Sequence, residues 1–226
     1  MHTYLNYYSC RTPLYKDGFC TVVLPDKWNS IQSFLRPLLP KGYVFLDYKY
    51  VINGPALFTY HRDVTSSQTT LNTSYPTYTA IHYEYEGEFL SVSPGSHIMW
   101  KFNIPTTIKG PQNTVVIFNC DLVHGGLDAP PNVTRKATQY KIAHLSDLHK
   151  LTEVQGISVV QKGSEVNPAL RTCMRIFSYV FVVPIQTVFL PLLQRRSFTG
   201  FSSFLQDLVP IQYFNNLKPA TIDRDR

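Results

Sequence analysis

The chain has 226 residues, of which 44% are hydrophobic and 16% are charged. This composition excludes a largely disordered chain, a collagen-like or coiled-coil fibre and a disulfide scaffold. Aromatic residues make up 14% of the chain and favour β-sheets over helix bundles. The net charge of +6 could favour an anionic substrate, nucleic acid or a lipid headgroup, but without a run of five basic residues it gives no strong signal for a nucleic-acid partner.

The first residues contain neither the basic region nor the apolar region of a secretory signal peptide. The four cysteines, Cys10, Cys20, Cys120 and Cys173, are widely spaced and form no CxxC motif. We therefore expect an intracellular, cytoplasmic protein whose thiols remain reduced.

The first elements in chain order are a strand at residues 20–24 and a helix that begins near residue 27 and is capped by Asp26. Pro37 is expected to end or kink this helix. From Tyr43 to about residue 145, short apolar runs alternate with Gly, Pro and Asn clusters, as in an all-β sandwich or barrel. Strands are expected at residues 43–52, 56–61, 78–85, 89–92, 114–119 and 138–143.

The last third of the chain has a different character. Residues 164–175 are predicted to form a helix, and residues 176–193 carry no charge. Pro184 and Pro191 interrupt a straight spanning helix, so we expect this segment to pack on the sheet, with contact to a membrane as the alternative.

These differences divide the chain into two parts. Residues 1–150 are expected to form the β domain, and residues 151–226 a helical, apolar C-terminal extension. The overall prediction is a mainly β (α+β) fold.

Three polar residues are the strongest candidates for a site. His61 and Asp63 are one residue apart, so on a strand they point to the same face. Alone this pair is a weak signal, but His124 follows the apolar run at residues 115–119 and precedes two glycines. Two imidazoles and one carboxylate form the facial ligand set of non-haem Fe(II) oxygenases. Zinc is the alternative metal, although its catalytic sites usually leave only one position open.

Arg135 lies eleven residues after His124. If the chain returns as an adjacent antiparallel strand, this residue comes close to the metal. A guanidinium there suits the distal carboxylate of a dicarboxylate, which it can bind through two contacts. The alternative is an arginine on the surface near a turn.

Four segments together resemble the phytanoyl-CoA dioxygenase-like branch of the Fe(II)/2-oxoglutarate-dependent dioxygenases, in the order found in that family. They are residues 14–24 (LYKDGFCTVVL), His61-Arg62-Asp63, residues 90–97 (LSVSPGSH) and residues 115–140, which contain HGG and RKATQY. The resemblance covers about residues 14–148. It implies a double-stranded β-helix, or jelly-roll, core with flanking helices.

The resemblance also implies the site. His61, Asp63 and His124 would hold Fe(II), and Arg135 would bind the C5 carboxylate of 2-oxoglutarate, with O2 as the second cosubstrate. The family often has an aromatic residue before a Thr-Ala step, so Tyr78 is a further candidate contact for 2-oxoglutarate, or else an ordinary aromatic residue of the barrel lining. The implied reaction hydroxylates a C–H bond of a small organic or lipid-like molecule and releases succinate and CO2.

Other placements remain open. His82 and Glu84 form an HxE pair that some related sites use instead, although the family does not place its ligands there. His97 closes a Pro-Gly-Ser turn and is expected to hold that turn by a hydrogen bond. The polar segment 65–77 could be a lid that selects the substrate or an ordinary loop. A jelly-roll binding module without catalysis, or a membrane-associated structural protein, is the alternative function.

Overall fold

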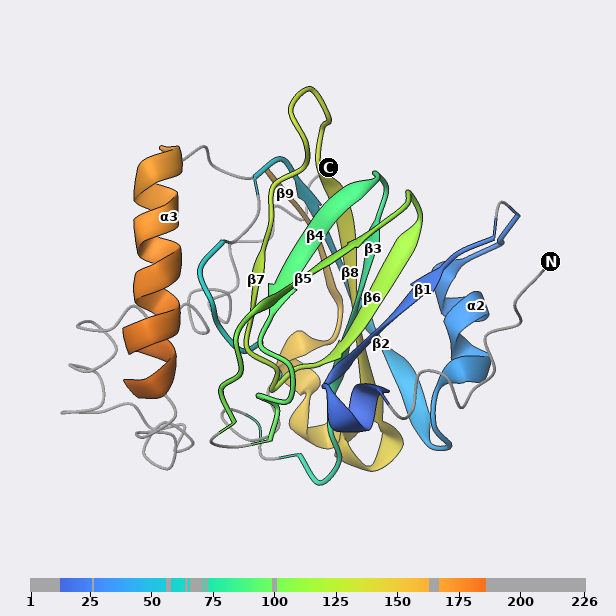
Figure 1. Ribbon diagram of the computed structural model, residues 1–226. Helices are drawn as coiled ribbons and strands as arrows, with labels where there is room; N and C mark the ends of the chain where they lie inside the picture. Colours follow the sequence, from blue (N-terminus) through green and yellow to red (C-terminus); the bar gives the residue numbers. More distant parts are fainter. Residues whose placement is uncertain are drawn as a thin grey trace.

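The computed structural model describes residues 13–185 except residues 26, 56–57, 64, 66–70, 72, 99–100 and 163–166. The fold is built around two β-sheets that face each other, with a long helix beside them (Figure 1). The mainly β fold predicted from the aromatic, strand-like sequence is therefore confirmed.

The larger sheet contains six strands in the order β1-β6-β3-β8-β2-β9. In that order they are β1 (Phe19–Val23), β6 (Thr114–Asn119), β3 (Tyr78–Tyr83), β8 (Lys136–His144), β2 (Tyr43–Asn53) and β9 (Ile157–Lys162). Neighbouring strands are antiparallel, except that β9 runs parallel to β2.

The smaller sheet contains β5 (Thr106–Gly110), β4 (Gly87–Val92) and β7 (His124–Gly126) in that order. An isolated antiparallel bridge between His61 and His124 extends this sheet by one more segment. The chain passes between the two sheets in the order of a double-stranded β-helix. β2, β3, β6 and β8 lie in the larger sheet, and residue 61, β4, β5 and β7 lie in the smaller sheet. The jelly-roll core is thus confirmed.

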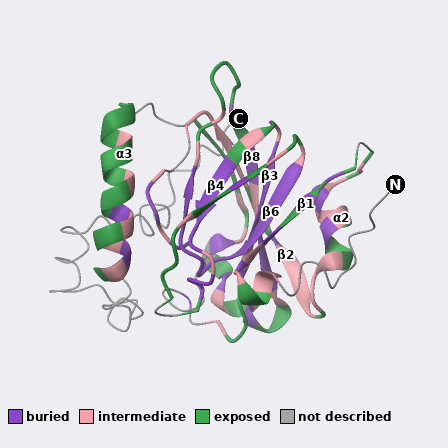
Figure 2. Ribbon diagram, in the orientation of Figure 1, coloured by how far each residue is buried: buried purple, intermediate pink, exposed green. Residues whose placement is uncertain are grey.

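The main core lies between the two sheets, where Tyr83 stacks on Phe89 with their ring centroids 4.4 Å apart. A second apolar layer covers the other face of the larger sheet. There α2 (Ile31–Leu35) and η1 (Arg36–Leu38) follow one another, and Ile31 and Leu35 are buried against the sheet. Figure 2 shows the buried residues concentrated in the strands.

Alternation along β3 determines which side chains can reach a site between the sheets. Ile81 and Tyr83 belong to the core between the sheets, whereas Ala80 belongs to the layer under α2. Because successive residues of a strand point to opposite faces, Thr79 points inward and Tyr78 and His82 point outward.

Several predicted elements differ in their bounds. The helix α2 begins at Ile31, where the Ser30 hydroxyl accepts a hydrogen bond from the Ser33 amide at 3.0 Å, and Asp26 lies outside the described residues. The strand expected at residues 56–61 is represented in the described residues only by the bridge at His61. β5, β7 and β9 were not predicted, because they are short or are polar edge strands without an apolar alternation.

The segment after residue 150 contributes to the core. After η3 (Leu145–Lys150) and η4 (Thr152–Val154), β9 completes the larger sheet. The helix α3 (Pro168–Phe177) continues through the π-helical η5 (Ser178–Val182) to Ile185, and residues 186–193 of the apolar segment lie outside the described residues. By length and composition, Pro168–Ile185 is the one helix in the described part of the chain that could cross a membrane.

Candidate metal centre

Two histidines are brought together by the backbone. The amide of His61 donates to the carbonyl of His124, and the amide of His124 donates to the carbonyl of His61, both at 2.9 Å. Their ring centroids are 4.4 Å apart. Gly125 allows this approach, because a Cβ atom at residue 125 would lie 2.9 Å from the carbonyl oxygen of Phe58. The glycine after His124 in the sequence is thus required by the close approach of two backbone segments.

The orientation of both rings is fixed by hydrogen bonds to main-chain carbonyls. Nδ1 of His61 binds the carbonyl of Thr59 at 2.8 Å, and Nδ1 of His124 binds the carbonyl of Leu122 at 2.9 Å. Nδ1 therefore carries the proton in each ring, and Nε2 is the nitrogen that can bind a metal.

The carboxylate of Asp63 has a different environment at each of its oxygens. Oδ2 accepts a hydrogen bond from Nζ of Lys141 at 2.6 Å and another from the hydroxyl of Thr79. Oδ1 lies 3.6 Å from Nε2 of His124. Lys141 and Thr79 are direct cross-strand partners on β8 and β3, with Nζ and Oγ1 2.8 Å apart. One oxygen is thus held by the protein, and the other faces the two imidazoles.

The charges in this buried cluster compensate one another. Burial alone would raise the pKa of Asp63, but Lys141 and the two histidines outweigh it and hold the pKa of the carboxyl well below its usual range. Burial likewise would lower the pKa of Lys141, but Asp63 outweighs it and the pKa is raised. Burial and the neighbouring His61 lower the pKa of His124 to about 3, and burial also lowers the pKa of His61. The site therefore holds neutral imidazoles and a paired carboxylate.

His61, Asp63 and His124 each offer one ligand atom, and these atoms all lie within 4.8 Å of one another. Asp63 and His124 are buried, whereas His61 is partly exposed to solvent. Three neutral or anionic donors that converge from one side match the facial set expected for non-haem iron. The structure thus brings together the three metal ligands proposed from the sequence.

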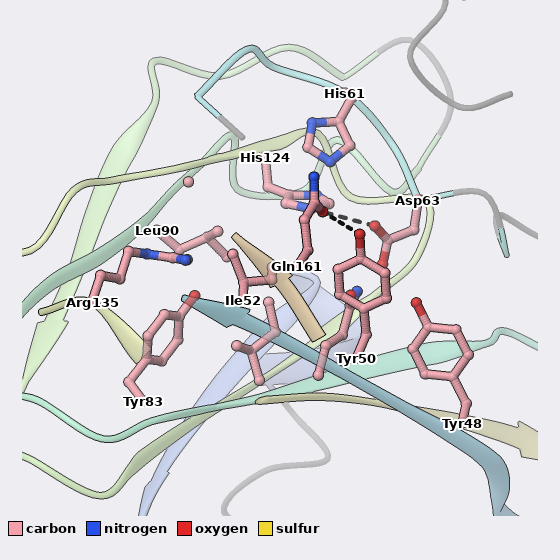
Figure 3. A pocket seen from close by; sticks show the side chains of 13 residues that line it. Tyr48, Tyr50, Ile52, His61, Asp63, Tyr83, Leu90, His124, Arg135 and Gln161 are labelled. Atoms are coloured by element: carbon pink, nitrogen blue, oxygen red, sulfur yellow. Dashed lines mark hydrogen bonds and ion pairs between the residues drawn. The ribbon is translucent and has the colours of Figure 1, made fainter. Parts of the chain in front are cut away.

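Arg135 lies in the same cavity, which has a volume of about 110 Å³. Figure 3 shows Arg135 and Tyr83 on one side and the three candidate ligands on the other. Arg135 is buried, its guanidinium carbon lies 5.8 Å from the centroid of the Tyr83 ring, and Nε and Nη1 have no hydrogen-bond partner among the described residues. A buried cation without polar partners is costly, so this part of the cavity is suited to an anion.

The mouth of the cavity includes residues from the C-terminal part of the chain. The hydroxyl of Tyr50 on β2 donates a hydrogen bond to the side-chain oxygen of Gln161 on β9. Tyr48 and Gln139 complete the polar lining on this side. Burial raises the pKa of Tyr48 to about 12, so its hydroxyl remains protonated at neutral pH.

No family model and no curated protein matches the sequence. Solved structures do match it at low identity. AviO1 from Streptomyces viridochromogenes Tue57 is 12% identical with a TM-score of 0.40, over 63% of this chain and 96% of that chain. The apo form of EctD from S. alaskensis is 15% identical with a TM-score of 0.43, over 74% and 91%. HygX from Streptomyces hygroscopicus, solved with nickel and 2-oxoglutarate bound, is 13% identical with a TM-score of 0.42, over 59% and 86%.

The strand order is that of a double-stranded β-helix, and the His-Asp-His cluster connects its two sheets. His61 and His124 are paired in the smaller sheet, whereas Asp63 contacts Thr79 and Lys141 of the larger sheet. The fold implied by the resemblance to the phytanoyl-CoA dioxygenase-like branch is thus present.

Within this double-stranded β-helix, Tyr78 is not at the site. Its ring packs against Tyr43 with centroids 5.4 Å apart, in the layer on the outer face of the larger sheet. Thr79 is the residue of this pair that points inward, and its hydroxyl contacts Asp63. The structure therefore corrects the expectation that Tyr78 binds the cosubstrate, because strand alternation places the neighbouring residue there.

The rival candidates also lie elsewhere. His82 contacts Asn113 and packs edge-on against Trp28 on the outer face, and Glu84 forms an ion pair with Lys136 at 2.7 Å. Nε2 of His97 binds the carbonyl of Tyr15 at 3.0 Å, which ties its turn to the N-terminal segment as expected. Residues 66–70 and 72 of the proposed lid lie outside the described residues.

Sequence reasoning did not identify Lys141 or Gln161 as site residues. Lys141 could have been found, because it is six residues after Arg135 and thus faces the same side of β8. Gln161 had no such signal, since it reaches the cavity only through the parallel pairing of β9 with β2.

The neutral state of His124 predicts acid sensitivity of the metal-free protein. The unfolded chain binds a proton at this residue below its ordinary pKa of about 6.5, whereas the folded protein does not until about pH 3. The free energy of unfolding is therefore expected to fall by about 2 kcal/mol between pH 7 and pH 5 from this residue alone.

Urea unfolding of the chelator-treated protein at several pH values measures this change. The same titration of His124→Gln should show a shallower fall. A wild-type stability that stays constant from pH 7 to pH 5 would contradict the burial of a neutral imidazole.

The contact between Lys141 and Asp63 predicts a large effect of Lys141→Met. This substitution leaves a buried carboxylate with one fewer partner, and removal of one member of a buried pair typically costs about 3–5 kcal/mol. Urea unfolding of the metal-free variant checks this loss.

Lys136→Met is the matched control, because Lys136 pairs with Glu84 at the surface and such pairs contribute about 0–1 kcal/mol. Equal losses in the two variants would refute the buried pairing. Adding Asp63→Asn to Lys141→Met should recover part of the stability, since it removes the unpaired charge.

Proposed function

We propose that the chain is a non-haem Fe(II)- and 2-oxoglutarate-dependent dioxygenase that hydroxylates a C–H bond of a small organic or lipid-like substrate. One observation carries the proposal: a single cavity contains both the His-Asp-His cluster and the buried Arg135, whose Nε and Nη1 lack partners among the described residues. A metal alone would account for the cluster, but it would not account for the arginine.

The ligand atoms favour iron over zinc. Two imidazole nitrogens and one carboxylate oxygen leave half of an octahedron open, which a chelating cosubstrate and O2 require, whereas catalytic zinc usually keeps one open position. When bound, Fe(II) supplies the oxidation of the substrate by O2, coupled to the conversion of 2-oxoglutarate into succinate and CO2.

Arg135 and Tyr83 fit the far end of 2-oxoglutarate. The hydroxyl of Tyr83 also has no hydrogen-bond partner among the described residues, and it lies on the same side of the cavity as Arg135 (Figure 3). A carboxylate there would accept hydrogen bonds from both groups and neutralise the buried guanidinium. A dicarboxylate can then contact Arg135 at one end and the metal at the other.

The remaining side chains orient the ligands and keep water out. Lys141 and Thr79 hold Oδ2 of Asp63, so Oδ1 is the oxygen presented to the metal. Tyr50 and Gln161 line the cavity and are joined by a hydrogen bond between their side chains, which limits access of water on this side.

Metal and cosubstrate binding can be tested by spectroscopy without a known substrate. Under anaerobic conditions, Fe(II) and 2-oxoglutarate together should give the weak visible charge-transfer band of a chelated keto acid. His61→Ala and Asp63→Ala should each abolish the band, because each removes one of three ligands.

Glu84→Ala is the control, since Glu84 is bound to Lys136 on the outer face. Loss of the band only in Glu84→Ala would transfer the site to the rival pair. A wild-type protein that binds Fe(II) but gives no band would indicate a binding module without this chemistry.

The role of Arg135 predicts a separation between metal binding and cosubstrate binding. Arg135→Ala should weaken 2-oxoglutarate binding by at least about thirtyfold, because the truncation of one partner of a buried charge pair costs 2 kcal/mol or more. Binding of Fe(II) should not change. Isothermal titration of the Fe(II)-loaded protein with 2-oxoglutarate measures the affinity.

Arg36→Ala, which removes an exposed arginine outside the cavity, should leave both affinities unchanged. If Arg135→Ala binds 2-oxoglutarate as tightly as the wild type, the proposed cosubstrate contact is wrong.

A further inference from the structure

The helix formed by α3 and η5 faces the sheets with polar side chains. Nη1 of Arg175 donates to the carbonyls of Phe58 and Gly126 at 3.0 and 2.9 Å. The hydroxyl of Ser178 accepts a hydrogen bond from the amide of Tyr60 at 2.8 Å. The hydroxyl of Tyr179 donates to the carbonyl of Asn103. Tyr179 also packs on Tyr60, and Val183 at the end of the helix is buried in the same cluster. The helix is thus attached to the body by polar and apolar contacts next to the segments that carry His61 and His124.

The outward face of the same helix is apolar. Leu170, Met174, Phe177 and Phe181 recur at spacings of four, three and four residues, which places them in one stripe. With Ile176 and Val180 beside them, these side chains are between 40% and 59% exposed. We call these six residues the α3 stripe. A surface helix ordinarily directs charged and polar side chains to solvent, so a continuous outward stripe of large apolar side chains is unusual even though part of the inward face is also apolar.

We propose that the α3 stripe docks on the surface of a lipid bilayer, with the helix axis parallel to the membrane. Figures 1 and 2 show α3 at the side of the molecule with most of its length exposed. Because Arg175 and Ser178 bind main-chain groups of the body, lipid cannot surround the helix, and only the stripe can enter the interface. The helix therefore lies on the membrane and does not span it, although its length and composition would allow a span.

The charge of this region is complementary to an anionic membrane. Between Glu165 and Asp207 the sequence contains no acidic residue and four arginines. Arg175 binds carbonyls of the body and Arg171 pairs with Asp128, so only the other two are assigned to contact with anionic lipid. The uncharged sequence that begins at Ile176 extends to Leu193 and is followed by Arg195-Arg196. Apolar residues followed by a pair of arginines provide both the burial and the electrostatic attraction that interfacial helices use.

A second copy of the chain fits the stripe less well than a bilayer does. Stable protein interfaces use about 20–30 residues on each side, whereas the stripe has six. A bilayer has no such requirement, since each apolar side chain that enters it contributes separately. The contact would form whether or not the metal centre binds iron.

Flotation of the full chain with vesicles of phosphatidylcholine mixed with phosphatidylglycerol tests the proposal. The wild type should float with the vesicles. Phe177→Glu/Phe181→Glu should reduce the partition coefficient by roughly tenfold or more, because two large side chains no longer enter the apolar region. Phe177→Leu/Phe181→Leu should retain binding.

The matched control is Ile104→Glu/Val160→Glu, which makes the same change of charge at two exposed apolar residues outside α3 and should float like the wild type. Absence of wild-type flotation, or equal loss in both Glu variants, would overturn the proposal. Size-exclusion chromatography with light scattering tests the alternative of a second copy. A wild-type dimer that becomes a monomer in Phe177→Glu/Phe181→Glu would also overturn the proposal.

Thermal unfolding without vesicles completes the test. The melting temperature of Phe177→Glu/Phe181→Glu should match that of the wild type, because the stripe is exposed in the free protein. If the melting temperature of the variant is markedly lower and the wild type does not float, another part of this chain covers the stripe and the proposal is wrong.

Discussion

The buried carboxylate of Asp63 is the constraint on which the rest of the site depends. A carboxylate inside a protein is tolerated only when hydrogen bonds and opposite charge replace the lost water. Lys141 and Thr79 supply these at one oxygen, and the other oxygen remains directed at His124. Burial keeps both imidazoles neutral, because it lowers the pKa of each histidine more than the nearby carboxylate raises it. Neutral imidazoles and an ionised carboxylate are the protonation states that a divalent metal requires.

Strand pairing produces this arrangement from residues that are far apart in the sequence. Thr79 and Lys141 are opposite each other in the register of β3 and β8, and His61 and His124 are joined by a reciprocal backbone bridge in the smaller sheet. Because side chains alternate along each strand, a slip of one residue in either pairing would move a site residue to the outer face. The metal centre is therefore a consequence of register in both sheets, and the apolar core between the sheets stabilises that register.

The sequence predicted the three candidate ligands because they follow short-range rules, and it missed residues whose position depends on pairing. The HxD spacing, the histidine before two glycines and the arginine eleven residues later could each be recognised locally. Tyr78 was chosen because the family often has an aromatic residue before a Thr-Ala step, but Thr79 is the inward residue of β3. A resemblance at one position does not determine which of two neighbouring strand residues faces the site. β9 and Gln161 were missed for a different reason. A parallel edge strand is recognised only when its partner is known, and its partner β2 lies about a hundred residues earlier.

The C-terminal third connects the cavity to the proposed membrane contact. β9 supplies Gln161 to the cavity mouth, and α3 binds the carbonyls of Phe58 and Gly126 beside the two histidine segments. The cavity that contains His61, Asp63 and His124 is therefore lined partly by the same region of the chain that carries the exposed α3 stripe. If the stripe docks on a bilayer as proposed, this connection holds the cavity close to the membrane surface. A lipid-like substrate could then keep its apolar part in the bilayer while only its reacting carbon enters the cavity.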